Sequence, residues 1–191
     1  TVTFAELEAD TNRIASGLIA AGARPGMRLA LLVRPSIDFI ALVFALLKSQ
    51  VAMVLIDPGM GRKNAIRCLA EVQPDGFVAI PAGQAIRTLL RRKFPKASLN
   101  VTVGRRWFWG GPTLEQIRQS GKAEPFDWEA SHDAPAAIIF TTGSTGPPKG
   151  VLYSHGNFDQ QVVQIRDQYG IQPGEIDLPG FPLFGLFNAA M

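Results

Sequence analysis

The chain has 191 residues, of which 47% are hydrophobic and 18% are charged. This composition is typical of a globular protein and excludes an intrinsically disordered chain. The formal net charge of +3 is too small to indicate a nucleic-acid partner. The longest apolar run, Phe39 to Leu47, has nine residues before Lys48, whereas a membrane-spanning helix needs about 20.

A single cysteine, Cys68, excludes an internal disulfide and indicates a reducing compartment, so we expect a cytoplasmic protein. Cys68 falls on the apolar side of a predicted helix, where we expect it to be buried and inert. Both histidines lie far from it in the sequence, so we predict no metal site built from His and Cys ligands.

Capping signals mark the starts of the predicted helices. Thr3 and Glu6 form a capping box, which predicts a helix that ends near Gly22. Ser36 predicts the start of a buried helix over 37–48. Further helices are expected over 63–72 and 84–93, and after a second capping box at 113–116.

In the helix predicted over 84–93, the hydrophobic spacing places Ile86, Leu89 and Leu90 toward the core. The basic run that ends it, 91–93, is expected to be a solvated helix end, which the helix dipole favours.

Strands are predicted between these helices, over 28–33, 51–56, 76–80, 100–103, 136–140 and 151–154. Strands that alternate with helices at this spacing predict an α/β fold around a mainly parallel sheet. Residues 121–135 are polar and contain Gly and Pro, which is typical of a linker. We therefore expect one α/β sub-lobe over 1–120 and the start of a second over 136–191.

The most informative stretch joins the last two predicted strands. Its nine residues, Thr142 to Gly150, contain three Gly, two Pro, three hydroxyl side chains and Lys149. Glycines allow a turn whose backbone N–H groups converge on an anion, and Lys149 adds a positive charge. The composition therefore predicts a phosphate-binding loop, placed where open α/β sheets bind ligands, at the end of a buried strand.

Two familiar phosphate loops do not fit this stretch. The nucleoside-triphosphatase pattern requires Gly-Lys-Ser/Thr leading into a helix, but Lys149 is followed by Gly150 and then by strand formers. The glycine spacing also differs from the dinucleotide-binding fingerprint. The simplest alternative is a flexible surface turn between two strands.

The stretch Thr141 to Gly150 resembles the pyrophosphate-binding signature of adenylate-forming enzymes, which include acyl-CoA synthetases, luciferases and adenylation domains of non-ribosomal peptide synthetases. The resemblance implies ATP and Mg²⁺ as cofactors, a carboxylic acid as the small-molecule substrate, and Lys149 as a pyrophosphate contact rather than a catalytic residue. The residues it implies for phosphate binding are Thr141, Thr142, Gly143, Ser144, Thr145, Gly146, Lys149 and Gly150.

A second resemblance concerns the acyl pocket, where Pro182-Leu-Phe-Gly185 takes the place of a family motif that ends in His. With the Pro-Pro-Lys loop, this run is similar to the β-lactone synthetases of bacterial long-chain olefin biosynthesis. It implies a 2-alkyl-3-hydroxy fatty acid substrate and possible protein partners of the same pathway. A long-chain acyl-CoA synthetase or acyl-AMP ligase remains the alternative. The implied pocket residues are Phe181, Phe184, Gly185 and Phe187, although core packing explains these apolar residues about as well.

Several family segments have no counterpart in the sequence, namely the adenine-binding segment, the ribose-binding Asp, the hinge and the lid lysine. We therefore expect the chain to be the first part of a larger enzyme and assign no catalytic residue.

Two other function classes remain open. A kinase or phosphatase would need carboxylates near the loop to hold Mg²⁺, and only Asp159 and Asp167 follow it within the next helix. A non-catalytic nucleotide-binding or interaction module would use Arg105–Trp109, whose Arg and aromatic residues could stack on bases, or dock a partner or a lipid-like substrate carrier. We expect its tryptophans to pack against the protein instead, and His155 to have a packing or hydrogen-bonding role.

Overall fold

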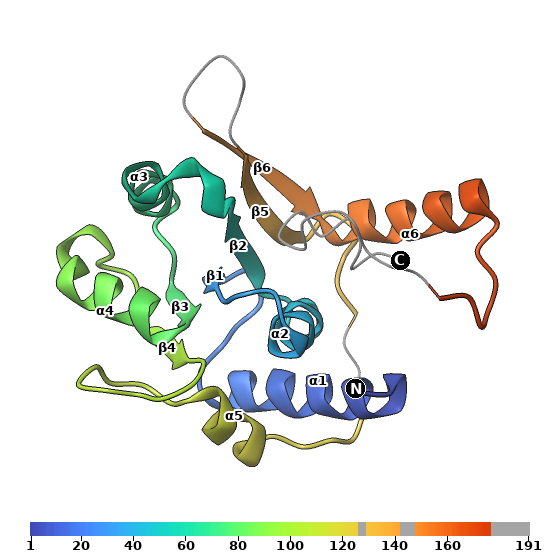
Figure 1. The fold of residues 1–191 in the computed structure, drawn as a ribbon, viewed down its shortest axis with the longest axis horizontal. Coiled ribbons are helices and arrows are strands. Elements are labelled where there is room, and N and C mark those ends of the chain that lie inside the picture. Colours follow the sequence, from blue (N-terminus) through green and yellow to red (C-terminus); the bar gives the residue numbers. More distant parts are fainter. Residues whose placement is uncertain (126–128, 142–147, 177–191) are drawn as a thin grey trace.

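The computed structural model describes residues 1–125, 129–141 and 148–176. Within these ranges, six strands form one sheet in the order β4-β3-β1-β2-β5-β6 (Figure 1). All neighbouring strands are parallel except β5 and β6, which are antiparallel. The predicted α/β fold with a mainly parallel sheet is thus confirmed. The strands are β1 (Arg28–Leu32), β2 (Ala52–Ile56), β3 (Gly76–Ala79), β4 (Leu99–Thr102), β5 (Pro135–Thr141) and β6 (Lys149–Ser154).

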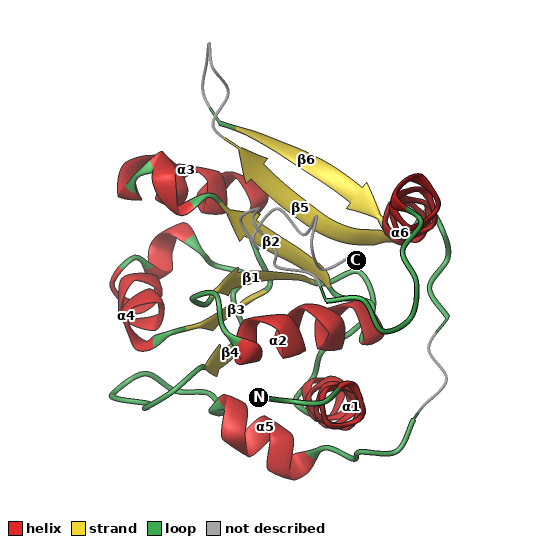
Figure 2. Cartoon of the chain, turned by 45° about the vertical axis from the view of Figure 1, so that its right-hand side comes forward, coloured by secondary structure: helices red, strands yellow, loops and turns green. Residues whose placement is uncertain are grey.

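The helices lie on both faces of this sheet (Figure 2). They are α1 (Phe4–Ala20), α2 (Ile37–Lys48), α3 (Arg62–Val72), α4 (Pro81–Leu89), α5 (Leu114–Ser120) and α6 (His155–Tyr169), with short 3₁₀ turns η1 (Pro58–Met60) and η2 (Arg91–Lys93). Helices α1, α2 and α5 cover one face, and α3 and α4 cover the other.

Alternate residues of the strands point to opposite faces and enter two separate cores. In β2, Met53 and Leu55 join the core under α1, α2 and α5, whereas Val54 and Ile56 join the core under α3. Strand β2 is buried along its whole length, which explains why it reads as a continuous apolar run.

The predicted caps are confirmed. Thr3 Oγ1 accepts a hydrogen bond from the Glu6 N–H at 3.2 Å, and the Glu6 carboxylate accepts one from the Thr3 N–H. Ser36 Oγ accepts a hydrogen bond from the Phe39 N–H at 3.2 Å and so caps α2, and the Thr113–Gln116 box begins α5. Cys68 is buried, as predicted.

Polar contacts hold the α1, α2 and α5 layer together. The buried Lys48 ammonium at the end of α2 donates to Glu8, Thr11 and Asn12 of α1, at 2.7–2.8 Å. Arg118 of α5 pairs with Asp10 and Asp38. Helices α1 and α5 also touch closely at Gly17, where a Cβ atom would lie only 2.2 Å from the Ile117 carbonyl oxygen. A larger residue at 17 would therefore push the two helices apart.

The predicted orientation of α4 is wrong at two of three positions. Ile86 is 40% exposed and Leu89 is 78% exposed, and only Leu90 packs against a core. The residue that faces inward is Gln84, which is fully buried and donates from Nε2 to the carbonyls of Phe77 and Val101. These two hydrogen bonds fix the rotation of the helix about its axis.

Strand β5 pairs with β2, so one sheet contains residues from both predicted sub-lobes. Residues 121–125 and 129–134 between them contain no helix or strand. The division into sub-lobes at 120 and 136 remains a prediction. None of the helices among the described residues is long and apolar enough to cross a membrane.

Candidate functional site

The candidate phosphate loop connects β5 to β6 at the edge of the sheet where β1, β2, β3 and β5 have their carboxyl ends. This follows from the parallel pairing of β5 with β2 and the antiparallel pairing of β6 with β5, whose last pair is Thr141 with Lys149. Open α/β sheets bind ligands at this edge. The structure defines the two strands that bracket the loop. Five predicted loop residues lie outside the described residues, namely Thr142, Gly143, Ser144, Thr145 and Gly146.

Lys149, the first residue of β6, is exposed. Among residues 1–125, 129–141 and 148–176, no acidic side chain forms an ion pair with its ammonium group. Within the described residues, no carboxylate therefore competes with an anion for the three N–H donors and the charge of Lys149.

Gly150 is required by packing rather than by an unusual backbone angle. A Cβ atom at this position would lie 2.9 Å from Cζ of Phe140 and 3.3 Å from a methyl carbon of Ile138. Phe140 is buried in the core under α3, so its ring rests directly against the β6 backbone. Glycine at 150 therefore allows the two strands of the hairpin to pack closely beside the loop.

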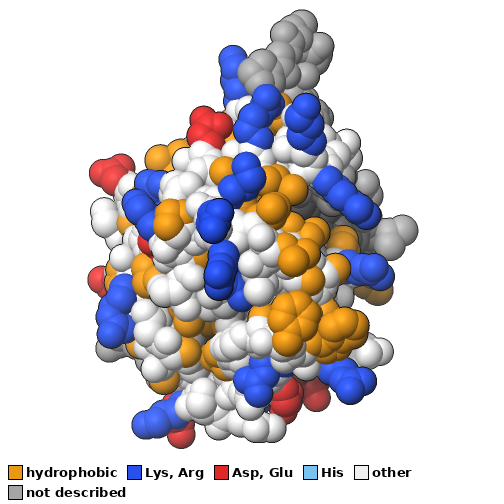
Figure 3. Space-filling model, turned by 90° about the vertical axis from the view of Figure 1, so that its left-hand side faces the viewer, with side chains coloured by type: hydrophobic (Ala, Val, Ile, Leu, Met, Phe, Trp, Pro, Cys, Tyr) orange, Lys and Arg blue, Asp and Glu red, His pale blue; other side chains and the backbone are white. Residues whose placement is uncertain are grey.

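The turn after β2 lies next to the end of β5. The Asp57 N–H donates to the Phe140 carbonyl at 3.3 Å, and the Asp57 carboxylate accepts from the Gly59 N–H at 2.7 Å, which orders η1. Helix α3 begins from this same edge with the exposed cations Arg62 and Lys63. Lys and Arg side chains are visible near the top of the molecule in Figure 3. The edge that bears the loop therefore carries the exposed cations Arg62, Lys63 and Lys149.

A capping box that we did not predict begins α6 directly after β6. Ser154 Oγ accepts from the Asn157 N–H, and Asn157 Oδ1 accepts from the Ser154 N–H at 2.8 Å. The His155 N–H donates to the Ala134 carbonyl at 3.0 Å. The sequence Ser-x-x-Asn carries this signal only weakly, because Glu or Gln is the usual residue at the fourth position of such a box.

His155 is 7% exposed, which confirms a packing role. Burial lowers the pKa of its imidazole, and the charge of Asp159 opposes this shift. The next residue, Gly156, touches His132, because a Cβ atom there would lie 2.9 Å from the His132 Nδ1. These contacts attach the start of α6 to the segment before β5. The start of β5 and the end of β6 are therefore held together at the end of the hairpin opposite the loop.

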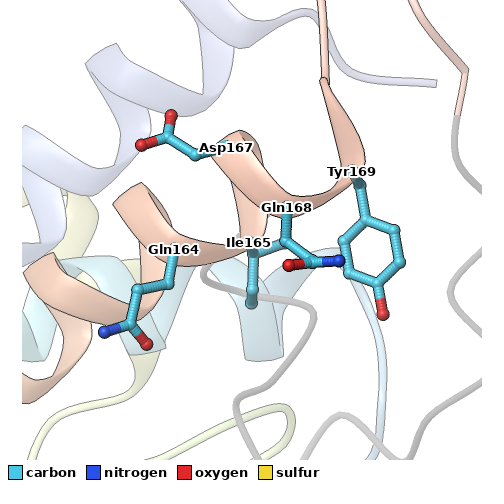
Figure 4. Close-up of a pocket in the computed structure, with 5 residues that line it drawn as sticks. All are labelled: Gln164, Ile165, Asp167, Gln168 and Tyr169. Carbon is cyan, nitrogen blue, oxygen red and sulfur yellow. The ribbon is translucent and has the colours of Figure 1, made fainter.

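An open hollow of about 620 Å³ borders the C-terminal half of α6 and is lined by Gln164, Ile165, Asp167, Gln168 and Tyr169 (Figure 4). Its nearest residue to the loop, Gln164, is nine positions beyond His155, or roughly 13 Å along the helix at 1.5 Å per residue. Among the described lining residues, the charged one is Asp167, which pairs with Arg166 at 3.0 Å. The hollow is therefore separate from the candidate phosphate site.

The other predicted site residues have mixed outcomes. The acyl-pocket residues Phe181, Phe184, Gly185 and Phe187 lie outside the described residues. In Arg105–Trp109, Trp109 is buried and donates from Nε1 to Thr102 Oγ1 at 2.9 Å, as expected. Trp107 stacks on Trp109 but is 65% exposed, so the prediction that the tryptophans pack against the protein is wrong for most of its surface. Among the described residues, no cluster of three His, Cys, Asp or Glu side chains is placed to hold a metal ion.

Two curated relatives match the whole chain. The olefin beta-lactone synthetase of Xanthomonas campestris pv. campestris is 44% identical over 192 residues, which cover 100% of this chain and 34% of the relative. The olefin beta-lactone synthetase of Stenotrophomonas maltophilia (strain K279a) is 42% identical and is covered to 35%. The chain thus spans about a third of the length of these relatives.

Solved structures with the same fold include a long-chain-fatty-acid-CoA ligase from Archaeoglobus fulgidus, at a TM-score of 0.85 and 21% identity over 99% of this chain and 38% of that protein. ATP-bound MatB from Rhodopseudomonas palustris superimposes at a TM-score of 0.81 with 22% identity, over 99% of this chain and 37% of its own.

A sequence model described as AMP-binding enzyme matches residues 1–184. The match includes both strands that bracket the loop and nearly the whole length of the chain. The chain therefore belongs to the AMP-binding enzyme family.

Proposed function

We propose that the whole protein activates a carboxylic acid with ATP, forming an acyl-AMP and pyrophosphate, and then converts a 2-alkyl-3-hydroxy fatty acid to a β-lactone. The observation that carries this proposal is the 44% identity, over the whole chain, to a protein described as an olefin beta-lactone synthetase. The exposed cations at the carboxyl edge of the sheet, including Lys149 beside the loop, support the ATP-dependent step.

In the first step, a carboxylate oxygen attacks the α-phosphorus of ATP. The bond from this phosphorus to the oxygen that bridges to the β-phosphate breaks, and pyrophosphate leaves. The β- and γ-phosphates would be held by Lys149, by the hydroxyls of Thr141, Thr142, Ser144 and Thr145, and by the backbone around Gly143, Gly146 and Gly150. Donors placed where charge grows in the transition state accelerate such a displacement. Mg²⁺ would enter with ATP, because it keeps most of its waters and binds chiefly to phosphate oxygens.

In the second step, the oxygen of the substrate's own 3-hydroxyl attacks the acyl carbon. The bond from this carbon to the AMP oxygen breaks, AMP leaves, and the hydroxyl proton passes to solvent. The nucleophile is tethered to its target, which gives it a high effective concentration and helps to offset the strain of a four-membered ring. We propose that the apolar residues Phe181, Phe184 and Phe187, with Gly185, shape the pocket for the acyl chain.

The second candidate function is a long-chain acyl-CoA ligase, in which the thiol of CoA is the nucleophile. It would share the acid-activating first step and differ in the nucleophile of the second step. A non-catalytic nucleotide-binding module is a more distant alternative, in which ATP binds without turnover.

Product analysis separates these candidates. The whole protein is incubated with MgATP and a 2-alkyl-3-hydroxyalkanoic acid, with and without CoA, and the products are identified by mass spectrometry. A β-lactone formed together with AMP in the absence of CoA is expected. A thioester formed only with CoA, from plain and hydroxylated fatty acids alike, would establish the ligase. The absence of any AMP and pyrophosphate would leave only the non-catalytic module.

A further inference from the structure

A hydrophobic surface on the side of α4 has no role in the proposed reaction. It comprises Ile86 and Leu89 of α4, which are 40% and 78% exposed, and Trp107 and Phe108 of the loop after β4, which are 65% and 71% exposed. In Figure 1, α3, α4 and this loop form the left-hand side of the molecule. Figure 3 shows that hydrophobic side chains gather on that side and that Lys and Arg side chains border them.

Interior hydrogen bonds fix the outward direction of these residues. Gln84 is fully buried and donates to the carbonyls of two strands, which turns the opposite side of α4, with Ile86 and Leu89, toward solvent. In the loop, Trp109 is buried and hydrogen-bonded to Thr102. The rings of Trp107 and Phe108 pack on Trp109 with centroids 6.1 and 5.0 Å apart. The hydrophobic surface is therefore an ordered part of the fold.

Positive charge is concentrated in residues 61–112, the segment that contains this hydrophobic surface. Residues 61–112 contain ten Lys and Arg and two acids, a net charge of +8, whereas the remaining 139 residues contain nine Lys and Arg and fourteen acids, a net charge of −5. One of the two acids, Asp75, already accepts a hydrogen bond from the Arg28 N–H. The exposed cations of the segment are Arg62, Lys63, Arg67, Arg91, Arg92, Lys93, Lys96, Arg105 and Arg106.

We propose that this surface binds the protein to an anionic lipid membrane, with Ile86, Leu89, Trp107 and Phe108 at the level of the headgroups and the surrounding cations on lipid phosphates. Aliphatic and aromatic side chains bordered by Lys and Arg are typical of proteins that lie on a membrane without crossing it. Arg and Lys can also place their apolar stems along the lipid while their charged ends remain hydrated.

Nucleic acid fits this surface less well than lipid does. Single-stranded nucleic acid uses aromatic rings for stacking and cations for phosphates, and Trp107 and Phe108 with their neighbouring arginines would meet that need. The exposed Ile86 and Leu89 offer nothing to a base or a phosphate, but they gain from transfer into the lipid interface. Membrane binding by this surface is independent of the acid and of the nucleophile in the proposed reaction.

The test is co-sedimentation of the whole protein with vesicles of phosphatidylcholine alone, or of phosphatidylcholine with one third phosphatidylglycerol. We expect strong binding to the anionic vesicles, weaker binding to them at high salt because charges are screened, and little binding to the neutral ones. Failure of the whole protein to bind anionic vesicles would overturn the proposal, since the surface would then be covered or inactive in it.

Two pairs of variants locate the binding surface. The double variant Arg91→Glu/Arg92→Glu is expected to lower the vesicle partition coefficient at least about 25-fold, because each cation near an anionic surface contributes about fivefold. The control Arg13→Glu/Arg24→Glu makes the same charge change at exposed sites on α1 and before β1, and should retain most of the binding.

Leu89→Ser/Phe108→Ser is expected to lower the partition coefficient at least about tenfold, whereas Phe4→Ser, at a 91% exposed site on α1, should leave it unchanged. ATP–pyrophosphate exchange reports whether each variant is folded. Equal losses in the test and control variants would overturn the proposal. So would displacement of the protein from vesicles by an equimolar amount of single-stranded polyuridylate, which would identify the surface as a nucleic-acid site.

Discussion

Two lysines show how differently the two ends of the molecule are built. Lys48, in the layer of α1, α2 and α5, has a side chain that is 8% exposed, and its ammonium donates to three acceptors on α1. Lys149, at the start of β6, is exposed and has no acidic partner among the described residues. All three donors of Lys48 are used inside the fold, whereas Lys149 makes no ion pair within the part of the chain that the structure describes.

The surroundings of the two lysines differ in the same way. The layer of α1, α2 and α5 covers a large buried core, while β6 and α6 leave apolar side chains such as Leu152 and Tyr169 60% and 71% exposed. We infer that the first region provides stability, and we propose that the second provides the phosphate-binding surface. Substitutions in the first should therefore change stability, and substitutions in the second should change activity.

The largest effect is expected from the core of the first region. Leu42 of α2 is completely buried, so Leu42→Ala should lower the free energy of unfolding by about 2–5 kcal/mol, because it removes apolar contacts and leaves a cavity. Leu152→Ala, at a 60% exposed position of β6, should change it by less than about 0.5 kcal/mol. Urea unfolding of the whole protein measures both. Similar losses for the two variants would remove the distinction between the regions.

The second prediction concerns Lys48 itself. Lys48→Met keeps much of the apolar stem but leaves the buried Thr11 and Asn12 oxygens without their donor. We expect a loss of about 1–3 kcal/mol in stability, the usual cost of a buried unpaired polar group, with little change in the adenylation rate of the folded enzyme. Lys122→Met, at an exposed site, serves as the control. An unchanged urea midpoint for Lys48→Met would show that this network does not stabilise the fold.

The third prediction concerns Lys149. Lys149→Ala removes a charge-assisted contact worth about 1.5–3 kcal/mol, so acid-dependent ATP–pyrophosphate exchange should fall roughly tenfold to a hundredfold. Its urea midpoint should stay at the wild-type value, because the side chain is exposed. Lys149→Arg, which keeps the charge, should retain more activity than Lys149→Ala. Full activity of the alanine variant would show that Lys149 does not contact the phosphates.

The smallest effect is expected from the pH dependence at His155. Burial holds the pKa of His155 below 6.5 in the folded protein, so the unfolded chain binds a proton more readily. Stability should therefore fall as the pH drops through about 6.5 toward the lowered pKa. His155→Gln removes this group and should flatten that part of the curve, while the exposed His132 remains in both proteins. Identical pH profiles would contradict a buried neutral imidazole.

Local signals explain why most helix starts could be predicted. A cap such as Thr3 with Glu6, or Ser36 before α2, lies within four residues of sequence and was confirmed in the structure. The resemblance of residues 141–150 to the signature of adenylate-forming enzymes likewise indicated the family, and the family match confirms it. The roles of individual loop residues remain predictions, because the structure does not describe residues 142–147.

Long-range contacts explain what the sequence could not provide. The rotation of α4 is set by Gln84, which reaches the carbonyl of Val101 seventeen residues away, and hydrophobic spacing alone placed Ile86 and Leu89 on the wrong side. Trp107 and Trp109 are two residues apart with the same composition around them, yet only Trp109 finds a buried acceptor in Thr102. The need for glycine at 150 likewise comes from Phe140, across the hairpin.

Acid activation by adenylation is the central claim, and an isotope experiment tests it most directly. The whole protein is given MgATP and a 2-alkyl-3-hydroxyalkanoic acid labelled with oxygen-18 in its carboxylate. The masses of the nucleotide and pyrophosphate products are then measured by mass spectrometry. Attack of the carboxylate on the α-phosphorus predicts AMP that carries one labelled oxygen and pyrophosphate that carries none. ADP as the product, or label in phosphate or pyrophosphate instead of AMP, would contradict the claim.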